Sequence, residues 1–427
     1  MAQSEAEFDV IISGGGLSGS LMALSLSDHK KADGSLLSIA IIEANEHQQV
    51  NLSKHTPVFD DRVLALSHGS AQYLKQVDVW PLLADKACAI KNIDISDRGH
   101  FGKSRLASDE FSVDALGYVI DMALIGKAIL QKLADKTNVA WFSPDSIQDI
   151  DWQSQSVNVQ LSSGQALTAQ LLLACDGANS VCRKQAQIDI EHNDYEQVAV
   201  IANVCTEKAH FNKAFERFTE HGPIAMLPLP LLSEQKSKYK SNQLGQGRCS
   251  LVWTMTPNQA QEITALSDEE FALALEQAFG LWLGKITQVG KSDVYPLALL
   301  QAKQQVFHRM ALIGNASHTI HPIAGQGFNL GLRDVAYLSE LIAHVLSDSA
   351  SHLANQGKVD IGSFALLQKY QLARSKDQQQ VIQLTDSLVT LFASDLPPLV
   401  VGRNTGLKLF DNVSVLKNVL VKKTMGY

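Results

Sequence analysis

The sequence predicts an α/β fold in which a Rossmann-like domain is interwoven with a mixed β-sheet domain and followed by C-terminal helices. Two observations support this fold class. Residues 8–42 follow the order strand, helix, strand, which is a βαβ unit at the start of the chain. The strands expected in the middle third of the chain do not alternate with helices, which is typical of a mixed sheet.

The opening unit is defined by its apolar pattern. Phe8–Ile12 is a short β-branched run, leucines recur at helical spacing up to about Ser27, and Ser38–Ile42 is a second apolar run. A short strand and a helix are predicted within 116–133. Further strands are predicted at 157–161, 169–174, 196–206, 224–230 and 306–313, helices at 268–279, 327–346 and most of 364–393, and a polar surface loop at 233–248.

Composition excludes several classes of protein. Of the 427 residues 45% are hydrophobic and 19% charged, enough to bury a sizeable core. The net charge of −8 argues against a general nucleic-acid binder, which needs a basic surface. Five cysteines without a C-x-x-C pair favour reduced thiols over disulfides or zinc, and we expect no metal. Since neither a secretory signal nor a bilayer-spanning run is present, we expect a cytoplasmic protein.

Three glycines, Gly14, Gly16 and Gly19, follow the first strand with the spacing G-x-G-x-x-G. The first permits a tight turn, the second lets the backbone approach a pyrophosphate, and the third lets helix and strand pack closely. The helix that follows presents free N–H groups and a positive dipole end to phosphates. Glu43, at the end of the second strand, can accept hydrogen bonds from an adenosine ribose and repels a 2′-phosphate. The segment therefore predicts a site for FAD or NAD rather than NADP.

Two later segments favour FAD over NAD. Residues 171–180 form an apolar strand that ends at Asp176, and residues 311–331 run from a strand through Gly314 and Asn315 into further glycines and a helix. Both segments place polar groups at the carboxyl end of a strand, where open α/β sheets bind ligands. A simple NAD dehydrogenase needs neither segment.

These three motifs, in this order, resemble those of the aromatic hydroxylase group of FAD-dependent monooxygenases, the group of 4-hydroxybenzoate hydroxylase. Signatures of the ubiquinone-biosynthesis hydroxylases within that group are resembled by residues 60–67, 386–392, 397–399 and 402–407. A narrower branch, the bacterial 2-polyprenyl-6-methoxyphenol hydroxylases, is resembled by residues 96–100, 195–204, 215–223 and 283–287. The resemblance covers nearly the whole chain except 233–248.

The resemblance implies an enzyme, an FAD-dependent NAD(P)H aromatic-ring monooxygenase. NADPH or NADH would bind transiently and reduce FAD, and O2 would supply the hydroxyl that converts 2-polyprenyl-6-methoxyphenol to 2-polyprenyl-6-methoxy-1,4-benzoquinol. It also implies a discontinuous domain arrangement. The FAD-binding domain is expected at 1–78, 108–188 and 295–348, the substrate domain at 79–107 and 189–294, and a C-terminal helical region at 349–427.

The resemblance also implies a place on the cofactor for each motif. Gly14, Gly16, Gly19 and Glu43 would hold the ADP part, Arg62 would lie by the flavin or its pyrophosphate, and Asp176 near the cofactor and the nicotinamide route. Gly314 and Asn315 would meet the ribityl-pyrophosphate region, and Gly325, Gln326, Gly327 and Asn329 the isoalloxazine edge. Much of the group has Asp where Asn315 stands, so this position forms hydrogen bonds without a charge and we expect a lower FAD affinity.

Residues that act on the substrate are less visible in the sequence. A base that removes the phenol proton would help hydroxylation, and His221, His318 and His321 are candidates from position alone. Each is also consistent with a structural role, so the catalytic base stays unassigned. Three alternative functions stay open: hydroxylation of another ring carbon in the same pathway, a flavin reductase or dehydrogenase that does not activate O2, and a non-catalytic scaffold in a biosynthetic complex.

Charge is distributed unevenly along the chain. Residues 401–427 carry a net charge of +4, and residues 1–400 a net charge of −12. A polyprenyl substrate partitions into membrane, and a basic, apolar segment can lie on anionic lipid. Residues 401–427 are therefore a candidate for peripheral contact with the inner membrane surface. The alternative is a C-terminal helix that packs on its own domain or on a partner subunit.

Overall fold

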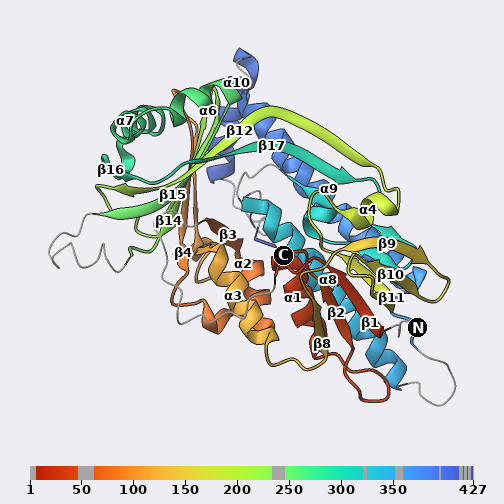
Figure 1. The fold of residues 1–427 in the computed structure, drawn as a ribbon. Helices are drawn as coiled ribbons and strands as arrows, with labels where there is room; N and C mark the ends of the chain where they lie inside the picture. Colours follow the sequence, from red (N-terminus) through yellow and green to blue (C-terminus); the bar gives the residue numbers. More distant parts are fainter. Residues whose placement is uncertain are drawn as a thin grey trace.

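Three β-sheets organise the part of the chain that the computed structural model describes. Two large sheets, joined by long strands and helices, form separate layers of the molecule (Figure 1). A small sheet of three strands lies between them, since its strands pack against β14 of one layer and against helix α8 of the other. The described residues are 6–46, 62–232, 246–320, 325–351, 359–393, 396–412, 417, 421 and 425–426.

The eight-stranded sheet contains the N-terminal βαβ unit. Its strands follow the order β18-β19-β11-β1-β2-β8, with β19, β11, β1, β2 and β8 parallel, and the antiparallel strands β10 and β9 continue from β11. The carboxyl ends of the parallel strands therefore meet at one edge. The strands are β1 (Ala6–Ser13), β2 (Ile39–Ile42), β8 (Val139–Phe142), β9 (Ile147–Trp152), β10 (Val157–Leu161), β11 (Ala166–Ala174), β18 (Val306–Phe307) and β19 (Met310–Leu312).

Helices cover one face of this sheet. Helix α1 packs against α3 and α8, and their apolar faces form one core with the strands, in which Leu21 and Leu338 are fully buried. These helices are α1 (Leu17–Ser27), α2 (His68–Gln76), α3 (Met122–Leu133) and α8 (Gln326–Ser351), with a 3-10 turn at Gly314–Ala316. The short helix α4 (Val181–Gln185) packs on the opposite face, where Cys182 is buried with Ile11.

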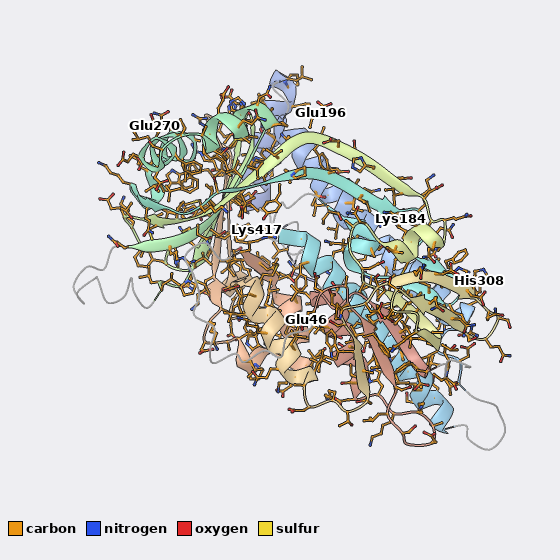
Figure 2. The ribbon with its side chains drawn as sticks, viewed as in Figure 1. Glu46, Lys184, Glu196, Glu270, His308 and Lys417 are labelled. Atoms are coloured by element: carbon orange, nitrogen blue, oxygen red, sulfur yellow. The ribbon has the colours of Figure 1, made fainter. Side chains whose placement is uncertain are left out.

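The nine-stranded sheet follows the order β20-β17-β12-β15-β14-β13-β5-β6, with β16 beside β12. Its outer face packs against α6 and α7 through a core that includes Trp253 and Phe271. Its longest strand, β12, bulges at Glu196, which has a φ of 54° (Figure 2). The elements are β5 (Asn92–Asp97), β6 (Lys103–Ala107), β12 (Ile190–Thr206), β13 (Lys213–Thr219), β14 (Gly222–Leu229), β15 (Gly247–Met255), α6 (Pro257–Thr264), α7 (Asp268–Phe279), β16 (Ile286–Val289), β17 (Asp293–Ala302) and β20 (His318–Thr319).

The small sheet connects the two layers. Its order is β3 (Val63–Ser67), β7 (Gly117–Asp121) and β4 (Cys88–Ile90), all antiparallel. Val63 and Val119 pack with Ala214 and Leu227 of the nine-stranded sheet in one apolar cluster. The inner face of the nine-stranded sheet therefore lies directly against the small sheet.

The long C-terminal helix α9 spans both layers. In α9 (Phe364–Ala393), Tyr370 donates a hydrogen bond to the Leu312 carbonyl of the eight-stranded sheet at 2.9 Å. Near its other end, Phe392 stacks on Phe218 of the nine-stranded sheet with ring centroids 3.7 Å apart. Helix α10 (Pro397–Asn412) then packs against β6. Among the described residues, no helix has both the length and the hydropathy to cross a bilayer.

The predicted fold class is confirmed, with two local corrections. The single strand expected at 306–313 is a hairpin of β18 and β19, because His308 adopts a φ of 45° and reverses the chain. The predicted loop at 233–248 ends earlier, since β15 begins at Gly247 and Arg248 is buried opposite Cys205. Residues 233–245 of that loop lie outside the described residues.

Candidate functional site

The glycine turn after β1 has the geometry that its spacing predicts. Gly14 has a φ of +95°, and a Cβ there would lie 2.6 Å from the carbonyl oxygen of Cys175. A Cβ on Gly19 would lie 1.9 Å from the carbonyl oxygen of Gly14, so helix α1 and the turn are in contact. A Cβ on Gly16, by contrast, would meet no atom within 4 Å. The first and third glycines are thus required by packing, and the second opens onto free space.

Helix α1 begins at this free space without a side-chain cap, so its first N–H groups are available to a ligand. Glu43, which follows β2, accepts a hydrogen bond from the N–H of Gly15 at 2.8 Å through Oε2. Its Oε1 accepts two hydrogen bonds from Asn45. These contacts hold the carboxylate beside the turn, where an adenosine ribose attached to a pyrophosphate would lie.

Asp176 lies next to the same turn, because a Cβ on Gly14 would be 3.0 Å from its Cα. Its Oδ2 accepts the N–H groups of Val181 and Cys182 at the start of α4. Its Oδ1 is buried and, within the described part of the chain, has no hydrogen-bond partner. An unpaired carboxylate oxygen at this edge is an acceptor for a ligand hydroxyl or amide.

The turn after β19 adjoins the turn after β1. Gly314 has a φ of +59°, and a Cβ there would lie 3.0 Å from Oγ of Ser18 in α1. Gly331 of α8 packs against it, since a Cβ on Gly331 would lie 3.0 Å from the Gly314 Cα. Asn315 is exposed at the tip of the turn. The structure therefore brings the first and third motifs together and leaves the Asn315 amide accessible.

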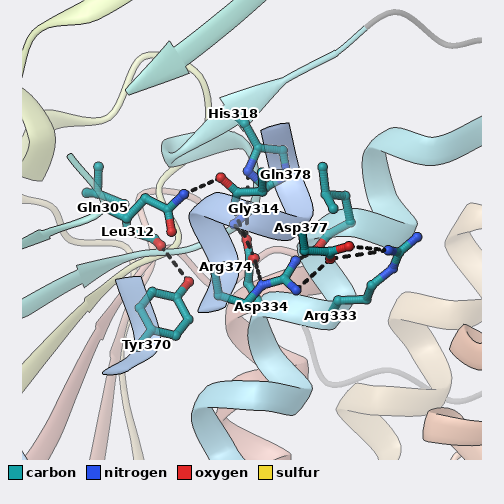
Figure 3. A network of polar contacts seen from close by, with 11 residues as sticks. Gln305, Leu312, Gly314, His318, Arg333, Asp334, Tyr370, Arg374, Asp377 and Gln378 are labelled. Atoms are coloured by element: carbon teal, nitrogen blue, oxygen red, sulfur yellow. Dashed lines mark hydrogen bonds and ion pairs between the residues drawn. The ribbon is translucent and has the colours of Figure 1, made fainter. Parts of the chain in front are cut away.

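Behind Gly314 lies a buried polar network of α8 and α9 (Figure 3). Asp334 is fully buried and accepts the N–H of Gly314 at 3.0 Å through Oδ2 and Nε of Arg374 at 2.7 Å through Oδ1. Arg374 also donates to Asp377, which is paired with Arg333. Two carboxylates and two guanidinium groups balance in charge, which offsets the cost of burying them. The network fixes the turn after β19 from the side opposite the site.

The sequence analysis did not single out Asp334 or Arg374. Asp334 lies on the face of α8 that also carries Leu330 and Leu338, both fully buried. A carboxylate within an apolar helical stripe is a signal of a buried partner, but the partner itself comes from α9, forty residues later.

The glycine segment at the start of α8 is held against β3. Gly325 has a φ of +61°, and a Cβ there would lie 2.8 Å from the Cβ of Ala65. The Asn329 amide is buried and fully used: Oδ1 accepts from Ser67 N and Ser70 Oγ, and Nδ2 donates to the carbonyl oxygens of Ala65 and Gly325. Asn329 thus positions the segment, and its side chain has no bond left for a ligand.

Gln326 and Gly327 form the start of α8, directly after Gly325. A Cβ on Gly327 would first meet Ile320 at 4.0 Å, so the backbone there is accessible. Gln326 lines a mostly apolar cavity of about 90 Å³ that extends to Ile93 of the nine-stranded sheet. The other lining residues are Ala65, Leu66, Ser67, Ile90, Leu106, Leu116, Gly117, Val421 and Met425.

Arg62 lies just before β3 and reaches toward the other layer. Its guanidinium carbon is 4.7 Å from the centre of the Tyr295 ring on β17. The side chain is exposed, so its charge is available on the same side as the glycine segment.

The candidate histidines are not brought together. His318 is fully buried with Nδ1 3.8 Å from Asp334 Oδ2, and burial lowers its pKa, so the ring is neutral at pH 7. His221 is exposed beside Glu220 in the turn between β13 and β14. His321 lies outside the described residues. A role as catalytic base is therefore favoured for neither His221 nor His318. Among the described residues, no cluster of His, Cys, Asp or Glu is arranged to hold a metal ion.

The basic C-terminal segment is partly internal. Arg403 is buried and pairs with Asp97 at 2.8 Å. Lys417, labelled in Figure 2, is also buried, and its Nζ donates to the Arg105 carbonyl at 2.7 Å and pairs with Glu110 at 3.2 Å. These two cations bind the segment to β5, to β6 and to the turn that follows β6, and are not available to lipid.

Comparisons with known proteins agree with this geometry. Residues 145–358, half of the chain, match a family described as FAD binding domain. The ubiquinone hydroxylase UbiL of Rhodospirillum rubrum is 31% identical over 423 residues, which cover 98% of this chain and 89% of the relative. The mitochondrial ubiquinone biosynthesis monooxygenase COQ6 of Rattus norvegicus is 30% identical over 471 residues, covering 98% and 91%.

Among solved structures, the p-nitrophenol 4-monooxygenase PnpA of Pseudomonas putida DLL-E4 superposes with a TM-score of 0.72 over 99% of both chains. At 17% identity this similarity establishes the fold alone. The free space at Gly16, the unpaired Oδ1 of Asp176 and the accessible Asn315 all fit bound FAD.

Proposed function

The chain belongs to the FAD-dependent hydroxylases of ubiquinone biosynthesis, and we propose that it converts 2-polyprenyl-6-methoxyphenol to 2-polyprenyl-6-methoxy-1,4-benzoquinol with O2 and NAD(P)H. The observation that carries the proposal is the position of β3. Ala65 contacts the glycine segment at Gly325, and Val63, two residues earlier, packs on the inner face of the nine-stranded sheet. A phenol on that face lies beside the flavin edge.

Bound FAD supplies the redox chemistry, since it takes electrons from the nicotinamide and delivers them to O2. The protein binds, orients and excludes water. Gly14, Gly16 and Glu43 hold the ADP part, and Gly314 and Asn315 hold the ribityl chain. Asn329 acts indirectly, by fixing the backbone of Gly325 against β3.

Gln326, Gly327 and Arg62 complete the flavin side of the proposed site. The backbone at Gly327 is accessible, and Gln326 lines the apolar cavity next to it. Arg62 places a positive charge where a pyrophosphate or a reduced flavin carries a negative one. Asp176 offers Oδ1 near the route by which NADPH or NADH reaches the flavin.

The polyprenyl tail requires an apolar path. The cavity between Gln326 and Ile93 is lined almost entirely by apolar side chains and is closed on one side by Val421 and Met425. We assign the start of the tail to this cavity. The inward residues of β14, Ala225 and Leu227, are half-buried and continue the apolar wall.

Contact with the inner membrane surface remains part of the proposal in a narrower form. Arg403 and Lys417 are buried ion-pair partners, so the lipid-facing charge would come from Lys408, Lys422 and Lys423. Truncation at residue 400 would remove a structural ion pair as well as these lysines. Flotation with anionic liposomes should therefore compare the full chain with a variant in which the three lysines are Glu. Equal flotation would contradict lipid contact through this segment.

Two measurements test the proposed function. With purified holoenzyme, ¹⁸O from O2 should appear in the product, whereas a reductase or dehydrogenase incorporates none. A deletion strain should accumulate 2-polyprenyl-6-methoxyphenol. Accumulation of an earlier or later quinone intermediate would assign the chain to a different ring carbon of the same pathway.

A further inference from the structure

One carboxyl group lies on the inner face of the nine-stranded sheet without a role in the site described above. Glu216 is in β13, and the strand alternates there: Phe215 belongs to the outer core under α7, while Ala214 belongs to the inner cluster with Val119. Glu216 therefore projects toward the nucleotide-binding half of the molecule.

Pairing registers place Glu216 in a row that crosses the sheet. It lies opposite Ile95 of β5 and Ala225 of β14, and Ala225 lies opposite Val252, which in turn lies opposite Ile201. All five side chains in this row are half-buried. Glu216 is the only ionisable group among these five, and the row continues from Ile201 to the exposed Asp293 of β17.

The rows on either side are much more enclosed. On one side Asp97, Phe218, Pro223, Thr254 and Ala199 are all buried. On the other side Ala214, Ser250 and Asn203 are buried, whereas Ile93 and Leu227 are half-buried. The half-buried row is therefore the part of this face that solvent can reach. The cavity lined by Gln326 reaches this face at Ile93, which pairs with Ala214, two residues before Glu216.

Several charged groups around this face have partners, and Arg248 is buried on the same face of β15 as Val252, four residues away. Asp97 is paired with Arg403 of α10, Arg62 lies over Tyr295, and Asp386 of α9 accepts a hydrogen bond from Tyr195. From the small sheet, Asp121 of β7 caps the start of α3. Within the described part of the chain, no basic side chain forms an ion pair with Glu216.

We infer that Glu216 is the group that takes the phenol proton, with the substrate ring lying between its row and the glycine segment at Gln326. This inference rests on the proposed function. In the step, the phenol O–H bond breaks and its proton moves to a carboxylate oxygen of Glu216. The ring oxygen keeps the electron pair, which makes the ring more electron-rich where the hydroxyl is added. Glu216 exchanges no electrons with the flavin.

The ionisation of Glu216 suits this role. Burial raises its pKa from the ordinary 4.5 to about 7. A carboxyl group with such a pKa is available as a base at neutral pH and holds a phenol proton better than an ordinary carboxylate does. The other four side chains of the row are apolar, so none of them competes with Glu216 for the proton.

The test uses FAD-loaded enzyme, NADPH or NADH, and two probes, a short-chain 2-prenyl-6-methoxyphenol and its ring-fluorinated, more acidic analogue. Glu216→Gln should lower kcat for the first probe by on the order of 100-fold. With the fluorinated probe, the kcat of this variant should fall much less, because the more acidic phenol loses its proton more readily without a protein base. The matched control is Glu220→Gln, an exposed carboxyl four residues further on, which should behave as wild type.

A second readout does not depend on turnover. Ultraviolet difference spectra of the oxidised holoenzyme with the acidic fluorinated probe should show bound phenolate whose pH dependence differs between wild type and Glu216→Gln. Glu216→Asp, which keeps a carboxyl, should retain the pH dependence at lower kcat.

The outcomes separate the inference from the proposed function. Wild-type enzyme that forms no ¹⁸O-labelled product would overturn the proposed function. A hydroxylating wild type whose Glu216→Gln variant keeps the same kcat and the same phenolate spectrum would overturn the role of Glu216 alone.

Discussion

The carboxylate of Asp334 in α8 accepts the backbone N–H of Gly314 at 3.0 Å, and the same carboxylate binds Arg374 of α9 at 2.7 Å. One buried side chain thus ties the turn that presents Asn315 to two long helices. The position of the turn depends on residues that make no contact with the space where the cofactor lies.

Asp334→Asn should destabilise the protein and weaken FAD binding together. Asn keeps an acceptor for Gly314 but removes the charge that balances Arg374, and breaking a buried pair costs about 3–5 kcal/mol. Thermal unfolding with and without FAD measures both effects. Glu340→Gln, an exposed change on the same helix, should alter stability by less than about 0.5 kcal/mol. Similar unfolding temperatures for the two variants would contradict the structural role of Asp334.

Gly16→Ala and Gly19→Ala should fail in different ways. A methyl group on Gly19 would overlap the Gly14 carbonyl at 1.9 Å, so the apoprotein itself should lose stability. A methyl group on Gly16 meets no protein atom, and the backbone there is extended, so the apoprotein should be unaffected. FAD binding by Gly16→Ala should weaken at least about tenfold, because the methyl group fills the space of the pyrophosphate. Fluorescence titration with FAD and calorimetry of the apoprotein distinguish the two cases.

Asn315→Ala should lower FAD occupancy without changing the stability of the apoprotein. Its amide is exposed at the tip of the turn and would bind a ribityl hydroxyl, a hydrogen bond that contributes about 1 kcal/mol. Asn315→Asp, which restores a charged acceptor, should bind FAD at least as tightly as wild type. Retention of full occupancy by Asn315→Ala on dilution would show that this side chain does not contact the cofactor.

Arg403→Ala should destabilise the contact between α10 and the nine-stranded sheet. The guanidinium pairs with Asp97, donates to the carbonyl oxygens of Leu391 and Phe392, and is buried. Its removal leaves Asp97 buried without its ion-pair partner, at a cost of about 3–5 kcal/mol. Lys408→Ala, on the exposed side of the same helix, is the control. Equal urea midpoints would argue against a structural role of the pair.

Glu216 should make the protein less stable as the pH rises, whereas most carboxyl groups have the opposite effect. Its pKa is about 7 in the folded protein against an ordinary 4.5, so the folded state holds the proton more tightly than the unfolded state. Stability from this group is present below pH 4.5 and is lost as pH rises through about 7, by at most about 3 kcal/mol. Glu216→Gln should therefore gain stability relative to wild type between pH 5 and 8. A constant difference between the two proteins across this range would contradict the raised pKa.

Local patterns in the sequence were enough to predict the first site motif. The G-x-G-x-x-G spacing depends on neighbours within one βαβ unit, and the structure gives Gly14 and Gly19 the tight turn and the close helix contact that this spacing requires. The contact of Glu43 with a ribose stays a prediction, and its carboxylate lies beside the turn. The fold class followed from the change between alternating and non-alternating elements. The first site motif lies within one βαβ unit of about forty residues.

Features that depend on distant partners could not be read in this way. Asn329 looked like a flavin contact because of its position in a glycine segment, yet its amide is consumed by Ser67, Ser70 and Ala65, about 260 residues earlier. Arg403 looked like a lipid-facing charge until its pairing with Asp97 was visible. Nothing in the sequence singled out Glu216, because its burial depends on which face of the nine-stranded sheet is covered by other parts of the molecule.

The order of strands in the eight-stranded sheet also bears on how the protein is made. β1 pairs with β11, and β11 pairs with β19, which ends at Leu312. A nascent chain on the ribosome cannot complete the central sheet until about three-quarters of the polypeptide has been synthesised, and α9 must follow before Tyr370 and Arg374 secure the last turn. Cofactor loading is consequently a late event in the life of each molecule, and chaperones meet this protein while β11 still lacks its neighbour β19.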